Sequence, residues 1–193
     1  MPSLPLPPLP QKGHKRALWR TPATRTGLAL EFLQAAGSLD RPVLVVARDS
    51  AHAHQLEADL LALSNPDRGA NLPILAFPDW ETLPYDVFSP HPQVVSQRLA
   101  VLRELPNLSR GIVIAPVQTL LQRIAPPSFL AGGSFDLRHG QRLSLEAERL
   151  RLEAAGYRTV PQVMDPGDFA VRGGLLDVYP MGTEQPFRIE LLD

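Results

Sequence analysis

Short, uninterrupted apolar runs alternate with helix-like segments over the first two thirds of this chain. The apolar runs are Val43–Ala47, Pro73–Phe77 and Gly111–Ala115. The helix-like segments, with apolar residues at helical spacing, span about residues 24–36, 50–63 and 95–105. A strand that is apolar on both faces is typical of the centre of a parallel sheet, which is where we expect Val43–Ala47. The alternation predicts an α/β domain with a doubly wound parallel sheet over residues 17–125.

Three local details complete this first domain. Ala17–Trp19 is expected as a short first strand. Gly37 is expected to close the first helix, and Ser50 is expected to cap the second.

The pattern changes after residue 125, where Pro126-Pro127 and Gly132-Gly133 interrupt it. We predict one helix, from Ser144 as its N-cap to about Gly156. Strand-like segments follow at residues 157–160, 168–172, 175–179 and 187–192. One helix with short strands predicts a small α+β domain with antiparallel strands over residues 126–193. Its last strand runs up to Asp193 without a turn, so we expect this domain to be truncated at its C-terminal end.

Composition excludes several classes of function. Residues 1–16 are rich in proline and are predicted to form a flexible, extended arm, for which docking to a proline-recognising partner is the alternative. This arm is not expected to be a signal peptide, and no run reaches the roughly 18 apolar residues of a membrane span.

The chain has 19 Lys+Arg, 20 Asp+Glu and no cysteine. Balanced charge argues against an electrostatic grip on duplex DNA, and the absence of thiols fits a cytoplasmic protein.

A nucleotide-binding loop would be expected at the first strand-to-helix turn. Such a loop needs glycines, a lysine for the phosphates and a Ser or Thr for magnesium. Here no glycine stands where the loop must wrap, and Pro22 removes one N–H donor. We therefore predict a degenerate phosphate loop at Thr24, Arg25 and Thr26, in which Arg25 is a candidate anion site.

No other enzyme constellation is visible in the sequence. Asp79, Glu81 and Asp86 lie close together but lack metal-ligand spacing and a partner histidine. No serine stands in a G-x-S-x-G turn. We predict no catalytic residue, metal or cofactor for this chain.

Four segments resemble the N-terminal region of the bacterial transcription-repair coupling factor (Mfd) family. They are Phe77–Asp86 with Phe88–His91, Ala115–Arg123, Gly156–Arg158 and Arg172–Gly182. They occur in the family's order. The resemblance implies a first domain related to UvrB, with a degenerate helicase or RecA-like fold, and a second small domain that recruits the repair protein UvrA. UvrB itself would carry an intact Gly-Lys-Thr loop, so the departure seen here favours the coupling factor over UvrB.

The resemblance also implies which residues contact UvrA. Arg158 and Arg172 are the leading candidates, with Phe169 and Tyr179 beside them. Arginine and aromatic residues are enriched at the hot spots of protein interfaces. The alternatives are that Tyr179 is a core residue and that Arg172 is a turn residue paired with Asp168.

The leading hypothesis is a non-catalytic module that recruits UvrA to stalled transcription complexes in nucleotide excision repair. The alternative is a fragment of an ATP-dependent, UvrB-like helicase with residual nucleotide binding. A third hypothesis qualifies the first: other domains of the full-length protein mask the docking surface. By resemblance, the full-length protein is an ATP-dependent DNA translocase that contacts RNA polymerase and duplex DNA through other domains.

Overall fold

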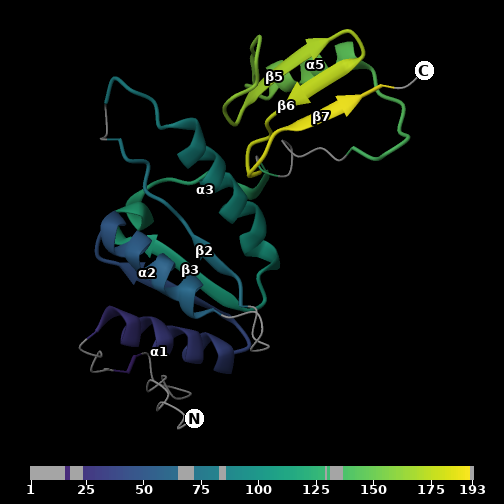
Figure 1. Cartoon of the computed structure of the whole chain (residues 1–193). Coiled ribbons are helices and arrows are strands. Elements are labelled where there is room, and N and C mark those ends of the chain that lie inside the picture. The colour runs from purple at the N-terminus through teal and green to yellow at the C-terminus, as the bar shows by residue number, and fades with distance from the viewer. Residues whose placement is uncertain are drawn as a thin grey trace. The chain divides into compact units, whose positions relative to one another are not determined.

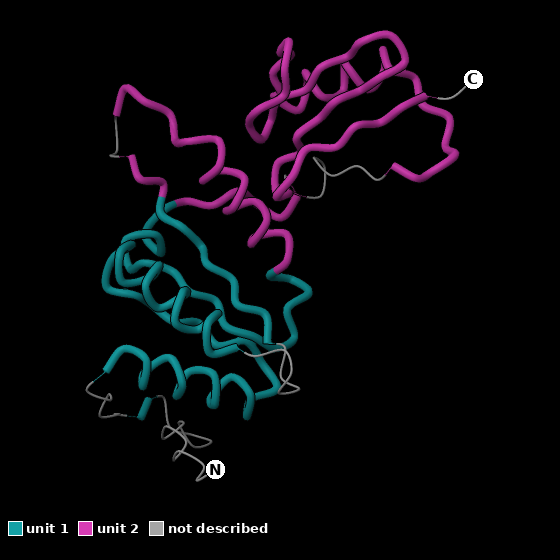
Figure 2. The backbone as a smooth tube through the Cα atoms, viewed as in Figure 1, with its two compact units in different colours: residues 1–79, 105–122 teal, residues 80–104, 123–193 magenta. Residues whose placement is uncertain are grey.

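The computed structural model describes residues 16–17, 24–64, 72–82, 86–128, 130 and 137–191 (Figure 1). The proposed arm, apart from its last residue, and most of the expected strand Ala17–Trp19 lie outside these ranges. The chain divides into two compact units (Figure 2). Unit 1 comprises residues 1–79 and 105–122, and unit 2 comprises residues 80–104 and 123–193. The domain boundary at residues 125 and 126 stays a prediction.

Unit 1 is built on a three-stranded parallel sheet. Its strands are β1 (Pro42–Ala47), β2 (Ile74–Ala76) and β3 (Gly111–Pro116), in the order β1-β3-β2. The parallel pairing confirms the α/β class. The central strand is β3, all six of whose residues are buried, whereas β1 lies at an edge of the described sheet. The expectation of a central β1 is thus corrected, because an apolar run indicates burial but does not state the order of strands.

Both described helices of unit 1 pack on the same face of this sheet. They are α1 (Arg25–Ser38) and α2 (Ser50–Leu63). Their shared core with the strands consists of Ala29, Ala36, Val45, Ala47, Ala53, Leu56, Leu60, Ile112 and Ile114. On β1, Val45 and Ala47 belong to this core, while Leu44 and Val46 alternate with them and are about half exposed. A second helical layer is therefore not seen within the described residues of unit 1, and the helicase-like assignment stays a prediction.

Side chains cap the N-termini of both α1 and α2. Asp49, one residue before the expected Ser50, caps α2 by accepting a hydrogen bond from the His52 N–H at 2.7 Å. That bond, together with Arg48, lowers the pKa of the Asp49 carboxyl. Helix α1 continues through Gly37 and ends at Ser38, so Gly37 is a helical residue and does not close the helix. Two short 3₁₀ helices, η2 (Leu105–Asn107) and η3 (Val117–Leu121), flank β3.

Within the described residues, unit 2 contains helices and a four-stranded mixed sheet. Its two longer helices are α3 (Pro92–Glu104) and α5 (Leu145–Ala154). The strands are β4 (Arg158–Thr159), β5 (Asp168–Arg172), β6 (Leu175–Val178) and β7 (Phe187–Glu190), in the order β4-β5-β6-β7. A separate sheet with antiparallel pairing from β5 to β7 is confirmed. The pairing of β4 with β5 is parallel, which corrects the expected all-antiparallel sheet.

The aromatic segment of the family-like sequence is only partly packed. The guanidinium of Arg98, itself buried in unit 2, lies 3.9 Å from the centroid of the Trp80 ring. Val87 and Phe88 are exposed in the same unit. None of the helices in the described part of the chain has the length and hydrophobicity that a membrane-spanning helix needs.

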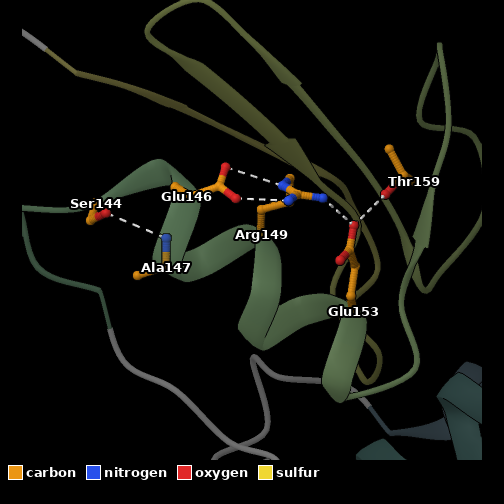
Figure 3. Close-up of polar contacts among 6 residues, drawn as sticks. All are labelled: Ser144, Glu146, Ala147, Arg149, Glu153 and Thr159. Carbon is orange, nitrogen blue, oxygen red and sulfur yellow. Dashed lines mark hydrogen bonds and ion pairs between the residues drawn. The ribbon is translucent and has the colours of Figure 1, made fainter.

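Helix α5 covers one face of the β4–β7 sheet. The core of this layer consists of Leu152, Phe169, Leu176 and Val178, and Leu145, Tyr157, Val171 and Ile189 pack around it. Ser144 caps α5 as predicted, its Oγ accepting from the Ala147 N–H at 3.3 Å (Figure 3). The opposite face of the sheet carries a different set of side chains.

A polar network ties the outer surface of α5 to the sheet (Figure 3). Arg149 donates hydrogen bonds to Glu146 and Glu153, and Glu153 also accepts from the Thr159 hydroxyl of β4 at 3.4 Å. The Arg149 guanidinium lowers the pKa of the Glu146 carboxyl, and the two carboxylates raise the pKa of Arg149. The bonds of Arg149 lie within α5, and the Thr159 bond to Glu153 links the helix to β4.

Candidate protein-docking surface

The strand register of unit 2 sorts its side chains onto two faces. Ala170 of β5 lies opposite Asp177 of β6, and Asp177 lies opposite Arg188 of β7. Directly opposed residues of antiparallel strands point to the same side of a sheet. These residues therefore lie on one polar face. The residues next to them in sequence, such as Phe169 and Val178, lie on the opposite face, which α5 covers.

Asp177 lies between two arginines on the polar face. Its Oδ1 accepts from Arg188 Nε at 2.6 Å, and its Oδ2 accepts from Arg188 Nη2 at 2.9 Å and from Arg172 Nη2 at 2.8 Å. The pair with Arg188 is thus bidentate, the geometry in which an arginine and a carboxylate bind most strongly. Hydrogen bonds from Arg188 first, and then from Arg172, lower the pKa of Asp177.

A second carboxylate holds the third arginine of this face. Arg158 of β4 pairs in register with Asp168 of β5, and its Nη2 donates to Asp168 Oδ1 at 2.8 Å. The other carboxylate oxygen accepts from the backbone N–H groups of Asp165, at 3.0 Å, and Met164, at 3.4 Å. Asp168 therefore anchors the preceding loop and Arg158 together.

The carboxylates lie beneath the guanidinium groups. The side chains of Asp168 and Asp177 are 5% and 12% exposed, whereas those of Arg158, Arg172 and Arg188 are 60%, 58% and 63% exposed. The outermost polar groups are thus N–H donors with a delocalised positive charge. Arginine groups held in this way suit carboxylate partners, since each guanidinium can donate two parallel hydrogen bonds. We name Arg158, Arg172 and Arg188, with Asp168 and Asp177, the arginine face.

The two aromatic residues predicted to contact a partner lie inside the unit. Phe169 is 0% exposed and belongs to the core under α5, so contact with a partner would require the core to open. Tyr179 is buried, and its hydroxyl donates to the Glu184 carbonyl at 2.8 Å. The alternation along β5, in which Phe169 and Val171 alternate with Asp168 and Arg172, is the sequence signal for this division. The contacts of Arg158 and Arg172 with a partner stay predictions.

Arg188 is the member of the arginine face that the sequence interpretation missed. Residues 187–192 are expected as a strand, and β7 spans Phe187–Glu190 of them, but nothing local indicates which strand this segment joins. Its pairing with β6 places Arg188 beside Asp177, eleven residues away. Arg172 forms an ion pair with Asp177. The partner considered from the sequence was Asp168.

The residues predicted to form a degenerate phosphate loop make structural contacts in unit 1. Thr24 caps α1, its Oγ1 accepting from the Gly27 N–H at 3.2 Å, and Thr26 is exposed in the first turn. Arg25 Nε donates to Asp59 Oδ2 at 2.5 Å, and its Nη1 donates to Gln55 Oε1 at 2.9 Å.

The charge expected to attract an anion is thus balanced by a carboxylate of α2. This ion pair raises the pKa of Arg25 and lowers the pKa of Asp59. The anion site at Arg25 gains no support from this geometry.

The acidic segment near residue 80 also has local contacts. Asp79 accepts hydrogen bonds from the Thr119 hydroxyl, at 3.3 Å, and from the Gln122 amide, and so fixes η3 to the end of β2 and its following loop. Within the described ranges, no three His, Cys, Asp or Glu residues are grouped so that they could hold a metal ion.

The segment that contains the arginine face matches a known domain family. Residues 135–193 match the family described as the UvrB interaction domain, so unit 2 carries a domain of this class. The chain is 45% identical over 152 residues to the transcription-repair-coupling factor of Escherichia coli (strain K12), which covers 79% of this chain and 13% of that protein. It belongs to the family of transcription-repair-coupling factors and corresponds to their N-terminal region.

Other relatives give the same picture. The identity is 46% over 150 residues with the transcription-repair-coupling factor of Haemophilus influenzae, covering 78% of this chain and 13% of that protein. The identity with the transcription-repair-coupling factor of Bacillus subtilis is 29% over 158 residues, which cover 82% of this chain and 13% of that protein. The chain therefore spans about an eighth of the length of the relatives it matches.

Proposed function

We propose that this chain is a docking module that binds UvrA through the arginine face of unit 2. The observation that carries the proposal is the match of residues 135–193 to the UvrB interaction domain, because this segment contains all four strands that build the face. In the full-length protein the module brings UvrA to stalled transcription complexes in nucleotide excision repair.

The geometry suits a docking role. Binding immobilises side chains, and this cost is lower for groups that are already held in place. Each guanidinium of the arginine face is held by a carboxylate and is still more than half exposed. The face therefore presents fixed donors to a partner without prior rearrangement.

The remaining activities belong to the full-length protein. We infer that it is an ATP-dependent translocase that works in the cytoplasm and contacts RNA polymerase and duplex DNA. These functions require domains beyond the part that this chain covers, since it spans 13% of its relatives.

Calorimetric titration of the 193-residue chain with purified UvrA tests the proposal. We expect saturable binding that weakens about tenfold with Arg172→Ala and with Arg158→Ala. The matched control is Arg149→Ala, which also breaks ion pairs but lies on α5, over the other face of the sheet. Binding that is absent, or that Arg149→Ala weakens as much as the other two substitutions, would contradict docking through the arginine face.

A further inference from the structure

Helix α3 contacts the UvrB interaction domain although it lies outside the matched segment. The match covers residues 135–193, whereas α3 spans Pro92–Glu104, and both belong to unit 2. The Oγ of Ser96, a residue only 3% exposed, accepts a hydrogen bond from the Gly182 N–H at 2.8 Å. A Cβ on Gly182, where φ is +84°, would lie 3.5 Å from the backbone nitrogen of Ala100. The turn at Gly182 therefore packs directly against the backbone of α3.

The turn that receives α3 is fixed by bonds within its own domain. The Met181 N–H donates to the Tyr157 hydroxyl at 3.0 Å, and Tyr157 packs against the core under α5. The Thr183 hydroxyl donates to the Pro180 carbonyl at 2.9 Å and so closes the turn on itself. Because these bonds tie the Pro180–Gly182 turn to the sheet and its core, α3 contacts a well-supported part of the domain.

The opposite side of α3 holds an aromatic ring. Arg98 is 2% exposed, and its guanidinium lies 3.9 Å from the centroid of the Trp80 ring. Residues four apart, such as Ser96 and Ala100, share one face of a helix, whereas Arg98 is two residues from each and points to the other side. Helix α3 thus has two contacts, with the turn at Gly182 on one side and with Trp80 on the other.

These contacts adjoin, in sequence, two places where the chain passes between its units. The chain enters unit 2 between Asp79 and Trp80, and it leaves unit 2 after Glu104, the last residue of α3. Glu81, next to Trp80, has φ +58°, a left-handed conformation that is costly for a residue other than glycine. Strained residues of this kind occur at switch regions, where the surrounding structure holds them in place.

We propose that α3 is a relay helix, which couples the Pro180–Gly182 turn of the UvrB interaction domain to the stacked ring of Trp80. The helix is a continuous hydrogen-bonded rod, so a shift of its Ser96 side also displaces Arg98. Loss of the Ser96 bond loosens the stacking, and loss of the stacking loosens that bond, because coupling between two sites is reciprocal. The relay goes beyond the proposed function, since it concerns contacts within this chain and does not depend on UvrA.

Tryptophan fluorescence tests the coupling in one direction. The chain has two tryptophans, so Trp19→Phe leaves Trp80 as the single one, and every chain in this experiment carries that change. Ser96→Ala removes the acceptor oxygen on the turn side of α3. We expect acrylamide to quench Trp80 more strongly in this variant, because the ring is released from its stacked position. The matched control is Gln97→Ala, at an exposed neighbouring position of the same helix, which should leave the quenching unchanged.

Hydrogen exchange followed by nuclear magnetic resonance tests the reverse direction. Arg98→Met keeps a long side chain but removes the cation that stacks on Trp80. Exchange of the Gly182 N–H should then accelerate about fivefold or more, the lower end of the usual coupling between two sites. Arg103→Met, at an exposed position of the same helix, is the matched control and should not change this rate. The β5 and β6 amides should exchange as in the unmutated chain, because the relay acts without unfolding the sheet.

The thermal unfolding midpoint of each variant shows whether it is folded. If Arg98→Met is unfolded, Trp80→Leu removes the same stacking from the other partner and replaces it in the exchange experiment. If Ser96→Ala is unfolded, Gly182→Ala replaces it in the fluorescence experiment, since a side chain at φ +84° strains the same contact from the turn.

The two readouts decide the inference without UvrA. Unchanged quenching of Trp80 in Ser96→Ala, or unchanged exchange of the Gly182 N–H in Arg98→Met, would refute the relay. Equal acceleration of the Gly182, β5 and β6 amides would also refute it, because that result indicates general destabilisation. Changes confined to Trp80 and Gly182 would support it. Failure of the relay leaves the proposed function standing, because docking of UvrA is tested separately.

Discussion

The orientation of α5 decides which face of the β4–β7 sheet is available to a partner, and two leucines of that helix test it. Leu152 is 2% exposed and packs in the core with Phe169, Leu176 and Val178, whereas Leu150 is 54% exposed. Truncating a buried leucine to alanine costs about 2–5 kcal/mol in free energy of unfolding, because apolar contacts are lost and a cavity remains. The same change at an exposed site costs within about 0.5 kcal/mol.

We therefore expect Leu152→Ala to destabilise unit 2 by about 2–4 kcal/mol more than Leu150→Ala. That is a large share of the roughly 5–15 kcal/mol that stabilises a typical domain. Urea unfolding followed by circular dichroism measures the difference in the chain as a whole. Hydrogen exchange of the β5 and β6 amides assigns it to unit 2, where exchange should accelerate about thirtyfold or more in Leu152→Ala. Equal effects of the two substitutions would refute the placement of α5 and would leave the arginine face without a structural basis.

Four other perturbations have defined outcomes. Arginines hold the pKa of Asp177 below its ordinary value, so its ion pairs stabilise the fold when the pH is above the ordinary pKa and lose this effect as the pH falls through the lowered pKa. In urea titrations, the stability advantage of the unmutated chain over Asp177→Asn should therefore shrink between pH 7 and about pH 3. Gly111 has φ +140°, and a Cβ there would lie 2.6 Å from the Pro73 carbonyl oxygen, so Gly111→Ala should destabilise unit 1 by about 1–3 kcal/mol. Gly37→Ala, in open space within α1, should stabilise it by about 0.5–1 kcal/mol, and a loss of thermal stability there would contradict the helical assignment. Ser144→Ala removes the N-cap of α5 and should cost about 1 kcal/mol in unfolding experiments, whereas no change would show that the cap is not formed.

The kinds of element in this protein could be predicted from local sequence. Periods of two and of about three and a half residues are properties of short segments, so α2, β3 and the strands of unit 2 were predicted close to their observed bounds. Ser144 was identified as a cap because capping depends on residues within one helical turn. The alternation of side chains along β5 also contains the information that Phe169 faces inward and Arg172 outward.

The partners of these elements were decided by the tertiary structure. Backbone hydrogen bonds are alike for all residues, so an apolar run does not state whether it is a central strand or, like β1, an edge strand. Arg25, a candidate anion site, forms an ion pair between helices with Asp59, which is 34 residues away in sequence. Arg188 meets Asp177 only because β7 pairs with β6 in one register, and a shift by one residue would turn Arg188 to the opposite face. The sequence alone thus determined the family and the kinds of element, while strand pairing, a non-local choice, decided which carboxylates hold Arg158, Arg172 and Arg188.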